Sequence, residues 1–192
     1  MYTMLKTCAG TTLVPAETRL MSERKLFLQG EITTDSALEL IRALMVLVNE
    51  DAEAPIDLYV SSPGGEVNAG MMIVDALAAM TTEVDITCVG MAASMAAIIL
   101  ASGKKGHRYI LPHSQVMLHE PLIPGGVGGS ASSIQRTAES ILETKRQIVR
   151  LLCAYTGRTK KEIEAAVSYD NYLNAEEAVA FGICDSVTDS II

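Results

Sequence analysis

A serine near the middle of the chain has the surroundings that a nucleophilic hydroxyl needs. In the segment GMAASM, a strand-like run ends at Gly90, and small residues lead to Ser94, which opens a predicted helix. Backbone N–H groups and the helix dipole at such a position stabilise developing negative charge. Taken alone, the segment favours the simpler interpretation of Ser94 as an N-cap residue beside small packed side chains. It also lacks the Gly-x-Ser-x-Gly pattern of the α/β-hydrolase elbow.

A second glycine turn, SPGG at residues 62–65, follows another strand-like run. Pro-Gly most often marks an ordinary turn, although an exposed N–H there could also donate to an oxyanion. The carboxyl ends of neighbouring parallel strands face the same crevice. The two glycine turns together therefore indicate a site more strongly than either turn alone.

Of the three histidines, His119 is the best candidate for a general base. It follows the apolar run at residues 116–118, so it can reach a crevice at a strand terminus. An imidazole exchanges protons near neutral pH, which suits that role. His107 lies in a basic turn and is expected to be solvated, and His113 follows a proline in another turn.

The acid that would orient this histidine cannot be chosen from spacing, because the chain has 23 Asp and Glu residues. Asp170 lies in a short polar break between two predicted helices. Glu120 and Asp185 also remain open.

Composition limits the class of protein and its partners. The 192 residues carry 15 Lys and Arg against 23 Asp and Glu, a formal net charge of −8. Such a surface repels phosphate backbones, and a chain with no Trp and two Phe offers few stacking platforms, so we expect no nucleic-acid partner. Hydrophobic residues at 49% and charged residues at 20% indicate one folded globular domain.

Cysteine placement and hydropathy predict a cytoplasmic protein with no metal site and no membrane partner. The four cysteines form no C-x-x-C motif and have no histidine at zinc-ligand spacing, and their small number favours a reducing compartment. The N-terminus lacks the apolar core of a signal peptide. The most apolar stretch, residues 84–101, is too polar to span a bilayer because it is interrupted by Asp85, Thr87, Gly90 and Ser94.

Short β-branched runs alternate with helical patterns, which predicts an α/β fold with parallel strands in a central sheet. A helix is expected after Asp35 as its N-cap, another over residues 68–80, and a third near Ser94. The predicted strands are residues 25–29, 56–61, 85–89, 108–111 and 115–118.

A long helix is predicted over residues 131–155, between a glycine-rich loop at 124–130 and Gly157. At about 1.5 Å per residue it spans roughly 37 Å, so we expect it to project from the body toward another subunit. Two shorter helices are predicted after it. The first begins at a capping box formed by Thr159 and Glu162. The second begins at a similar pair, Asn174 and Glu177, and ends at Gly182.

Four motifs stand in one order along the chain: SPGG at residues 62–65, GMAASM at 90–95, MLHEPL at 117–122 and YLNAEEA at 172–178. Together they resemble the ClpP family, the proteolytic subunits of the caseinolytic, Clp-type protease. The resemblance runs from residue 25 to residue 187, and a match of this kind is highly specific.

The resemblance implies a crotonase-like, ClpP-type α/β fold with a parallel-strand core sheet and a projecting long helix used for ring–ring docking. Residues 1–192 would form a single peptidase domain. Within it, the family pattern implies an N-terminal segment at 1–24, a head at 25–122, a handle loop and long helix at 123–157, and C-terminal helices at 158–192.

The resemblance also implies a serine endopeptidase. Ser94 would be the nucleophile, His119 the general base and Asp170 the acid that orients the imidazole. Gly65 and Met95 match the positions whose backbone N–H groups form the oxyanion hole.

Members of the family assemble into heptameric rings that stack into a tetradecamer around a closed chamber. An AAA+ unfoldase of the ClpX, ClpA or ClpC type feeds unfolded protein into it. The unfoldase uses the ATP, so the resemblance implies no cofactor for this chain, which also lacks a Gly-x-x-x-x-Gly-Lys-Ser/Thr loop.

Several positions depart from the family pattern. The N-terminal axial loop looks truncated, and the glycine-rich loop is about two residues longer, with Ser130 near the usual glutamine. Tyr169 stands where an arginine commonly pairs across the ring interface, and Asp57 and Ala79 stand where the outer docking pocket usually has aromatic residues. We therefore expect a ring that works best with a paralogous ClpP ring.

Two alternatives remain at this stage. A crotonase-type hydratase or isomerase acting on acyl-CoA would share the fold but normally places carboxylates where Ser94 and His119 stand. A latent or modulatory ring subunit acting with a paralogous ClpP would share the assembly.

Overall fold

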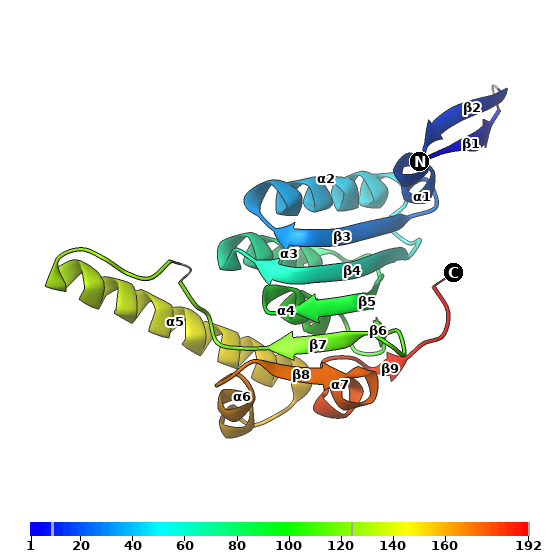
Figure 1. Cartoon of the computed structure of the whole chain (residues 1–192). Coiled ribbons are helices and arrows are strands. Elements are labelled where there is room, and N and C mark those ends of the chain that lie inside the picture. Colours follow the sequence, from blue (N-terminus) through cyan, green and yellow to red (C-terminus); the bar gives the residue numbers. More distant parts are fainter. Residues whose placement is uncertain (9, 124, 192) are drawn as a thin grey trace.

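The computed structural model describes residues 1–8, 10–123 and 125–191 and shows an α/β protein built on one mostly parallel sheet (Figure 1). The sheet order is β3-β4-β5-β6-β9, with β7 beside β5 and β8 beside β7. Every pairing in this sheet is parallel except that of β7 with β8. The strands are β1 (Tyr2–Thr7), β2 (Gly10–Pro15), β3 (Lys25–Ile32), β4 (Ile56–Gly65), β5 (Val84–Ala93), β6 (Arg108–Ile110), β7 (Gln115–Leu118), β8 (Asn171–Asn174) and β9 (Ser186–Val187).

The helices alternate with the strands, as the sequence predicted. In the order of the chain they are α1 (Ala16–Met21), α2 (Thr34–Glu50), α3 (Val67–Ala79), α4 (Met95–Ser102), α5 (Ala131–Thr156), α6 (Lys160–Ala166) and α7 (Ala175–Phe181). Helix α4 is apolar on all sides and its residues 95–101 are buried, because it lies between the sheet and the helices α3 and α5. None of the described helices is long and apolar enough to cross a membrane.

Helix ends follow the predicted capping chemistry, with one correction. The capping boxes that begin α6 and α7 are confirmed, and Gly157 and Gly182 close α5 and α7 in left-handed conformations. The N-cap of α2 is Thr33 and not Asp35, because the extended Thr33 backbone lets its hydroxyl accept the Ser36 N–H while Ser36 bonds back. Asp35 lies in the first turn.

The N-terminal segment contains a β-hairpin that the sequence analysis did not predict. Strands β1 and β2 pair antiparallel over their full lengths, from Tyr2 opposite Pro15 to Thr7 opposite Gly10. This hairpin extends from the end of the molecule opposite α5 (Figure 1). Its side chains contribute no buried core, so hydrophobic alternation gave no signal for it.

Helix α5 has 26 residues, about 39 Å, and its first half extends beyond the strands (Figure 1). Ile148, Val149 and Leu152 in the second half are buried against the body. Ile134 and Leu142 in the first half are exposed. The helix therefore presents an apolar surface that the single chain does not cover.

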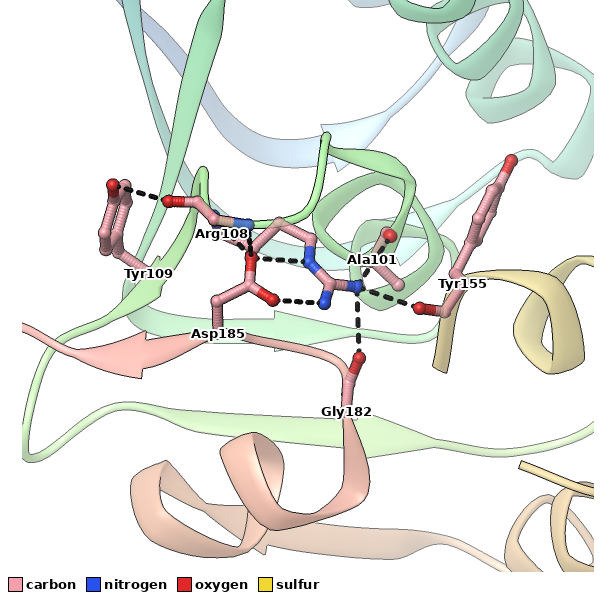
Figure 2. Close-up of polar contacts among 7 residues, drawn as sticks. Ala101, Arg108, Tyr109, Tyr155, Gly182 and Asp185 are labelled. Carbon is pink, nitrogen blue, oxygen red and sulfur yellow. Dashed lines mark hydrogen bonds and ion pairs between the residues drawn. The ribbon is translucent and has the colours of Figure 1, made fainter. Parts of the chain in front are cut away.

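Arg108 joins three helices at their C-terminal ends (Figure 2). Its side chain is 2% exposed and donates to the carbonyl oxygens of Ala101, Tyr155 and Gly182, at 3.2, 3.1 and 3.0 Å. It also forms a two-point ion pair with Asp185, at 2.9 and 2.5 Å. A guanidinium suits this place because helix C-termini carry partial negative charge and a carboxylate accepts its planar fork.

Candidate active site

Ser94 lies at the sharp bend between β5 and α4. Its backbone has φ 54° and ψ −120°, a region that non-glycine residues rarely adopt. The bend is held from outside, because the Ser94 N–H donates to the Met117 carbonyl on β7 at 2.8 Å. The residue occupies the N-cap position of α4, yet its side chain makes no capping hydrogen bond. Strain of this kind, supported by surrounding structure, is typical of functional sites.

His119 is brought to Ser94 by the pairing of β5 with β7. Ala93 lies opposite Met117 in the parallel register, so the residues that follow both strands emerge at the same edge of the sheet. The distance between His119 Nε2 and Ser94 Oγ is 2.7 Å. With the ring proton on Nδ1, the Ser94 hydroxyl donates to Nε2, which is the geometry required for proton transfer.

Asp170 faces the other ring nitrogen. It directly precedes β8, and β8 runs antiparallel to β7 with Leu118 opposite Asn171. The Asp170 Oδ1 atom is 3.9 Å from His119 Nδ1, and the Asp170 side chain is 68% exposed. This distance exceeds a hydrogen bond, so the carboxylate is near the imidazole without holding it.

The other two acids that the sequence left open have different partners. Glu120 is paired with Lys145 on α5, and Asp185 is paired with Arg108. Among the three candidates, Asp170 is the one beside His119 Nδ1.

The turn predicted at residues 62–65 is instead the end of β4, where Gly64 and Gly65 pair with Glu31 and Ile32 of β3, and this glycine segment packs directly against the Ser94 bend. A Cβ atom on Gly64 would lie 2.7 Å from the Ala93 carbonyl oxygen, 2.8 Å from Ser94 Cβ and 3.1 Å from the Met95 nitrogen. A Cβ on Gly65 would lie 2.2 Å from the Ile32 carbonyl oxygen. Both glycines have positive φ, so side chains are excluded here by sterics and by backbone conformation. The structure thus brings Gly64 beside the first residue of α4 and Gly65 against β3.

Ser62 is a supporting residue that the sequence analysis missed. It is 2% exposed; its hydroxyl donates to the Gly30 carbonyl at 2.6 Å and accepts the Gly64 N–H at 3.1 Å. These two hydrogen bonds hold the end of β4 in the position where it approaches Ser94. The signal was present in the sequence, since serine two residues before a turn glycine commonly bonds the backbone in this way.

The remaining histidines lie elsewhere. His113 is in an exposed turn, as expected. The expectation that His107 is solvated is wrong: its ring lies between Asp85 and Glu83 and its side chain is 26% exposed.

Comparison with protein families gives a match over almost the whole chain. The family model described as Clp protease matches residues 10–190 of the 192-residue chain. The chain belongs to the Clp protease family. The resemblance found in the four motifs is therefore confirmed, and the match extends it through β2 and α1 at one end and over residues 188–190 at the other.

Proposed function

We propose that this Clp-type chain is a serine endopeptidase that hydrolyses peptide bonds of unfolded polypeptides. The observation that carries the proposal is the 2.7 Å contact between Ser94 Oγ and His119 Nε2 at a strained bend. A hydroxyl that only capped α4 would bond to the helix N-terminus, and this one bonds to an imidazole. A crotonase-type hydratase has less support, because such enzymes normally place carboxylates at these two positions.

In the proposed reaction, His119 accepts the Ser94 proton as Oγ attacks the carbonyl carbon of the scissile peptide. The Gly65 and Met95 N–H groups donate to the oxyanion of the tetrahedral intermediate. His119 then protonates the leaving amine, and the acyl group stays on Ser94 until water, activated by the same imidazole, releases it. Asp170 moves within hydrogen-bonding distance of Nδ1 and stabilises the imidazolium.

The same proposal includes a ring assembly with a crotonase-like, ClpP-type protomer. Residues 123–157 act as the handle, and the exposed Ile134 and Leu142 on α5 support its role in docking two heptameric rings into a tetradecamer. An AAA+ unfoldase supplies ATP-driven unfolding, and this chain needs no cofactor. We assign the activity to the cytoplasm, since a reducing compartment suits free cysteines at positions 8, 88, 153 and 184.

A latent or modulatory ring subunit is the second candidate. It is favoured by the 3.9 Å separation of Asp170 from His119 and by the exposure of the neighbouring Tyr169, which is 64% exposed. In this second candidate, contact with a facing ring or a paralogous ClpP subunit would order both residues. Under this alternative, Asp170 comes within hydrogen-bonding distance of His119 only when a partner subunit binds.

A combined assembly and hydrolysis experiment tests the proposal. The chain is expressed alone, its mass is measured under native conditions, and hydrolysis of a small fluorogenic peptide is followed. Ser94→Ala and His119→Ala should abolish turnover without changing the mass, because each removes reacting atoms without adding bulk. His113→Ala, in an exposed turn, is the matched control and should keep full activity. Appreciable turnover by purified Ser94→Ala would contradict the assignment of the nucleophile.

A further inference from the structure

A second group of reactive side chains lies at the other end of β5. Among the residues that the structure describes, the one group of three His, Cys, Asp or Glu side chains with ligand atoms all within 4.8 Å of one another is Glu83, Asp85 and His107. Glu83 precedes β5, whereas Ser94 follows it. This group is therefore separate from the proposed peptidase site, and the inference below does not depend on that function.

The backbone places the three side chains on one face of the sheet. Glu83 and Asp85 are two residues apart, so in extended chain their side chains point the same way. Strands β5 and β6 pair in parallel with Ile86 opposite Arg108, and the Ile86 N–H donates to the His107 carbonyl at 2.8 Å. His107 thus lies beside Asp85. Glu83 and His107 directly precede β5 and β6, and their carbonyl oxygens accept the Ile56 and Ile86 N–H groups, so hydrogen bonds at the start of the sheet hold both positions.

The two carboxylates contact different nitrogens of the His107 ring. Asp85 Oδ1 is 2.8 Å from Nδ1, a hydrogen bond in which Nδ1–H donates. Glu83 Oε2 is 3.5 Å from Nε2. With the proton held on Nδ1 by Asp85, the Nε2 lone pair faces the Glu83 carboxylate. In this tautomer no proton lies between the lone pair and the carboxylate oxygen, and a cation placed there, either a proton or a metal ion, would satisfy both.

The 3.5 Å spacing fits a metal ion between these two atoms. Tetrahedral Zn²⁺ binds imidazole nitrogen and carboxylate oxygen at about 2.0–2.1 Å, which places two ligands about 3.3–3.4 Å apart. The Glu83 and His107 atoms therefore need to move by only a few tenths of an ångström. Asp85 then has the position of the outer carboxylate that fixes the tautomer and orientation of many metal-binding histidines.

Surrounding charges also favour a cation. Asp57 on β4 lies directly opposite Asp85, and burial, together with the Asp85 charge, raises the pKa of Asp57. The positive charge of Lys25 lowers the pKa of Asp57, but its effect is smaller than those of burial and Asp85. A divalent ion at His107 would reduce the excess negative charge.

We propose that Glu83 and His107 bind a divalent transition-metal ion, Zn²⁺ above all, with Asp85 as the positioning residue. An imidazole nitrogen selects Zn²⁺ over Mg²⁺ and Ca²⁺, which prefer oxygen ligands. Two protein ligands leave the other coordination positions to water, so the ion exchanges with solvent. The bound ion links the start of β5 to the segment that leads into β6.

Calorimetric titration of the full-length chain with Zn²⁺ at pH 7.5, after removal of metals with a chelator, tests this site. The wild type should show a binding event with a Kd tighter than about 1 mM that is absent from His107→Ala and Glu83→Gln. Asp85→Asn should weaken the same event by about 10–100-fold. His113→Ala and His119→Ala are the matched controls and should keep it, which separates this site from Ser94 and His119.

A second readout guards against loss of folding. Zn²⁺ should raise the Tm of the wild type but not that of His107→Ala or Glu83→Gln, and all three should have similar Tm values in chelator. The proposal is overturned if the His107→Ala and Glu83→Gln titrations match the wild type. It is also overturned if His113→Ala fails to show the Zn²⁺ binding event seen with the wild type.

Discussion

Asp170 Oδ1 lies 3.9 Å from Nδ1 of His119, on the side of the ring opposite the 2.7 Å contact with Ser94. The proposed nucleophile and base are within hydrogen-bonding distance of each other, whereas the proposed orienting acid lies about 0.7 Å beyond the upper limit of about 3.2 Å for such a bond. Catalytic hydrogen bonds are often long before substrate binds and shorten in the reacting complex. We therefore expect the last step of site formation to occur when subunits assemble or substrate enters.

Replacing Asp170 tests this step. Asp170→Asn should lower kcat on a fluorogenic peptide by on the order of 10²-fold or more, because the amide cannot stabilise an imidazolium. Its native mass should equal that of the wild type. Asp189→Asn, at another exposed acid, is the control and should retain full activity. Equal kcat for Asp170→Asn and the wild type would mean that another acid orients His119.

The glycine segment at the end of β4 offers a test with a matched control. Gly64→Ala should lower kcat at least 10²-fold, because the new Cβ would meet Ser94 Cβ and the Ala93 carbonyl and displace the bend. Gly106→Ala carries the same kind of strain, since φ is +92° there and +94° at Gly64, but its Cβ meets no atom within 4 Å. If kcat falls equally in the two variants, backbone strain and not the contact with Ser94 is responsible.

Much of this architecture could be predicted from residue patterns. The apolar runs in the middle of β4 and β5 are buried on both faces, whereas β3 alternates buried and exposed residues, and both patterns are recognisable without tertiary context. Capping residues at α6 and α7 act locally, so they were also predicted correctly. The predicted N-cap of α2 was two residues too late, because Thr33, Thr34 and Asp35 are all acceptable caps and the position where β3 ends decides among them.

The parts that could not be predicted depend on contacts between distant segments. Strand β8 has four residues with an intermediate and exposed pattern, and it exists because β7 offers an edge. The sequence could not choose among Asp170, Glu120 and Asp185, because each acid is selected by its partner in space. The group around His107 was missed for the same reason, since His107 is 22 residues from Asp85.

The buried Arg108 should be a main determinant of stability. Arg108→Met leaves the Asp185 carboxylate without its partner and three helix-end carbonyls without a donor, so unfolding should become easier by about 3–5 kcal/mol. Arg108→Lys should lose less, because it keeps the charge without the planar fork. Denaturant titration at fixed protein concentration measures both. Arg146→Met, in an exposed pair with Glu143, is the control and should leave stability almost unchanged.

Asp57 should make stability depend on pH. Burial and the Asp85 charge raise its pKa above the ordinary 3.8, so the folded chain binds this proton more tightly than the unfolded chain does. Ionisation of Asp57 therefore removes stability as pH rises through the raised pKa. In chelator, Asp57→Asn should have a higher Tm than the wild type at pH 7, and the gain should shrink as pH falls toward 3.8. A lower Tm for Asp57→Asn at pH 7 would contradict this account.

Labelling with a serine-directed fluorophosphonate tests the central claim most directly. Attack by Ser94 Oγ on phosphorus displaces fluoride and leaves a stable adduct, and it requires His119 to take up the serine proton. Mass mapping of the native assembly should place the adduct on Ser94, and His119→Ala of the same native mass should remain unlabelled. An assembled ring whose Ser94 stays unmodified, or an adduct that forms equally in His119→Ala, would contradict the proposal that this pair is a catalytic nucleophile and its base.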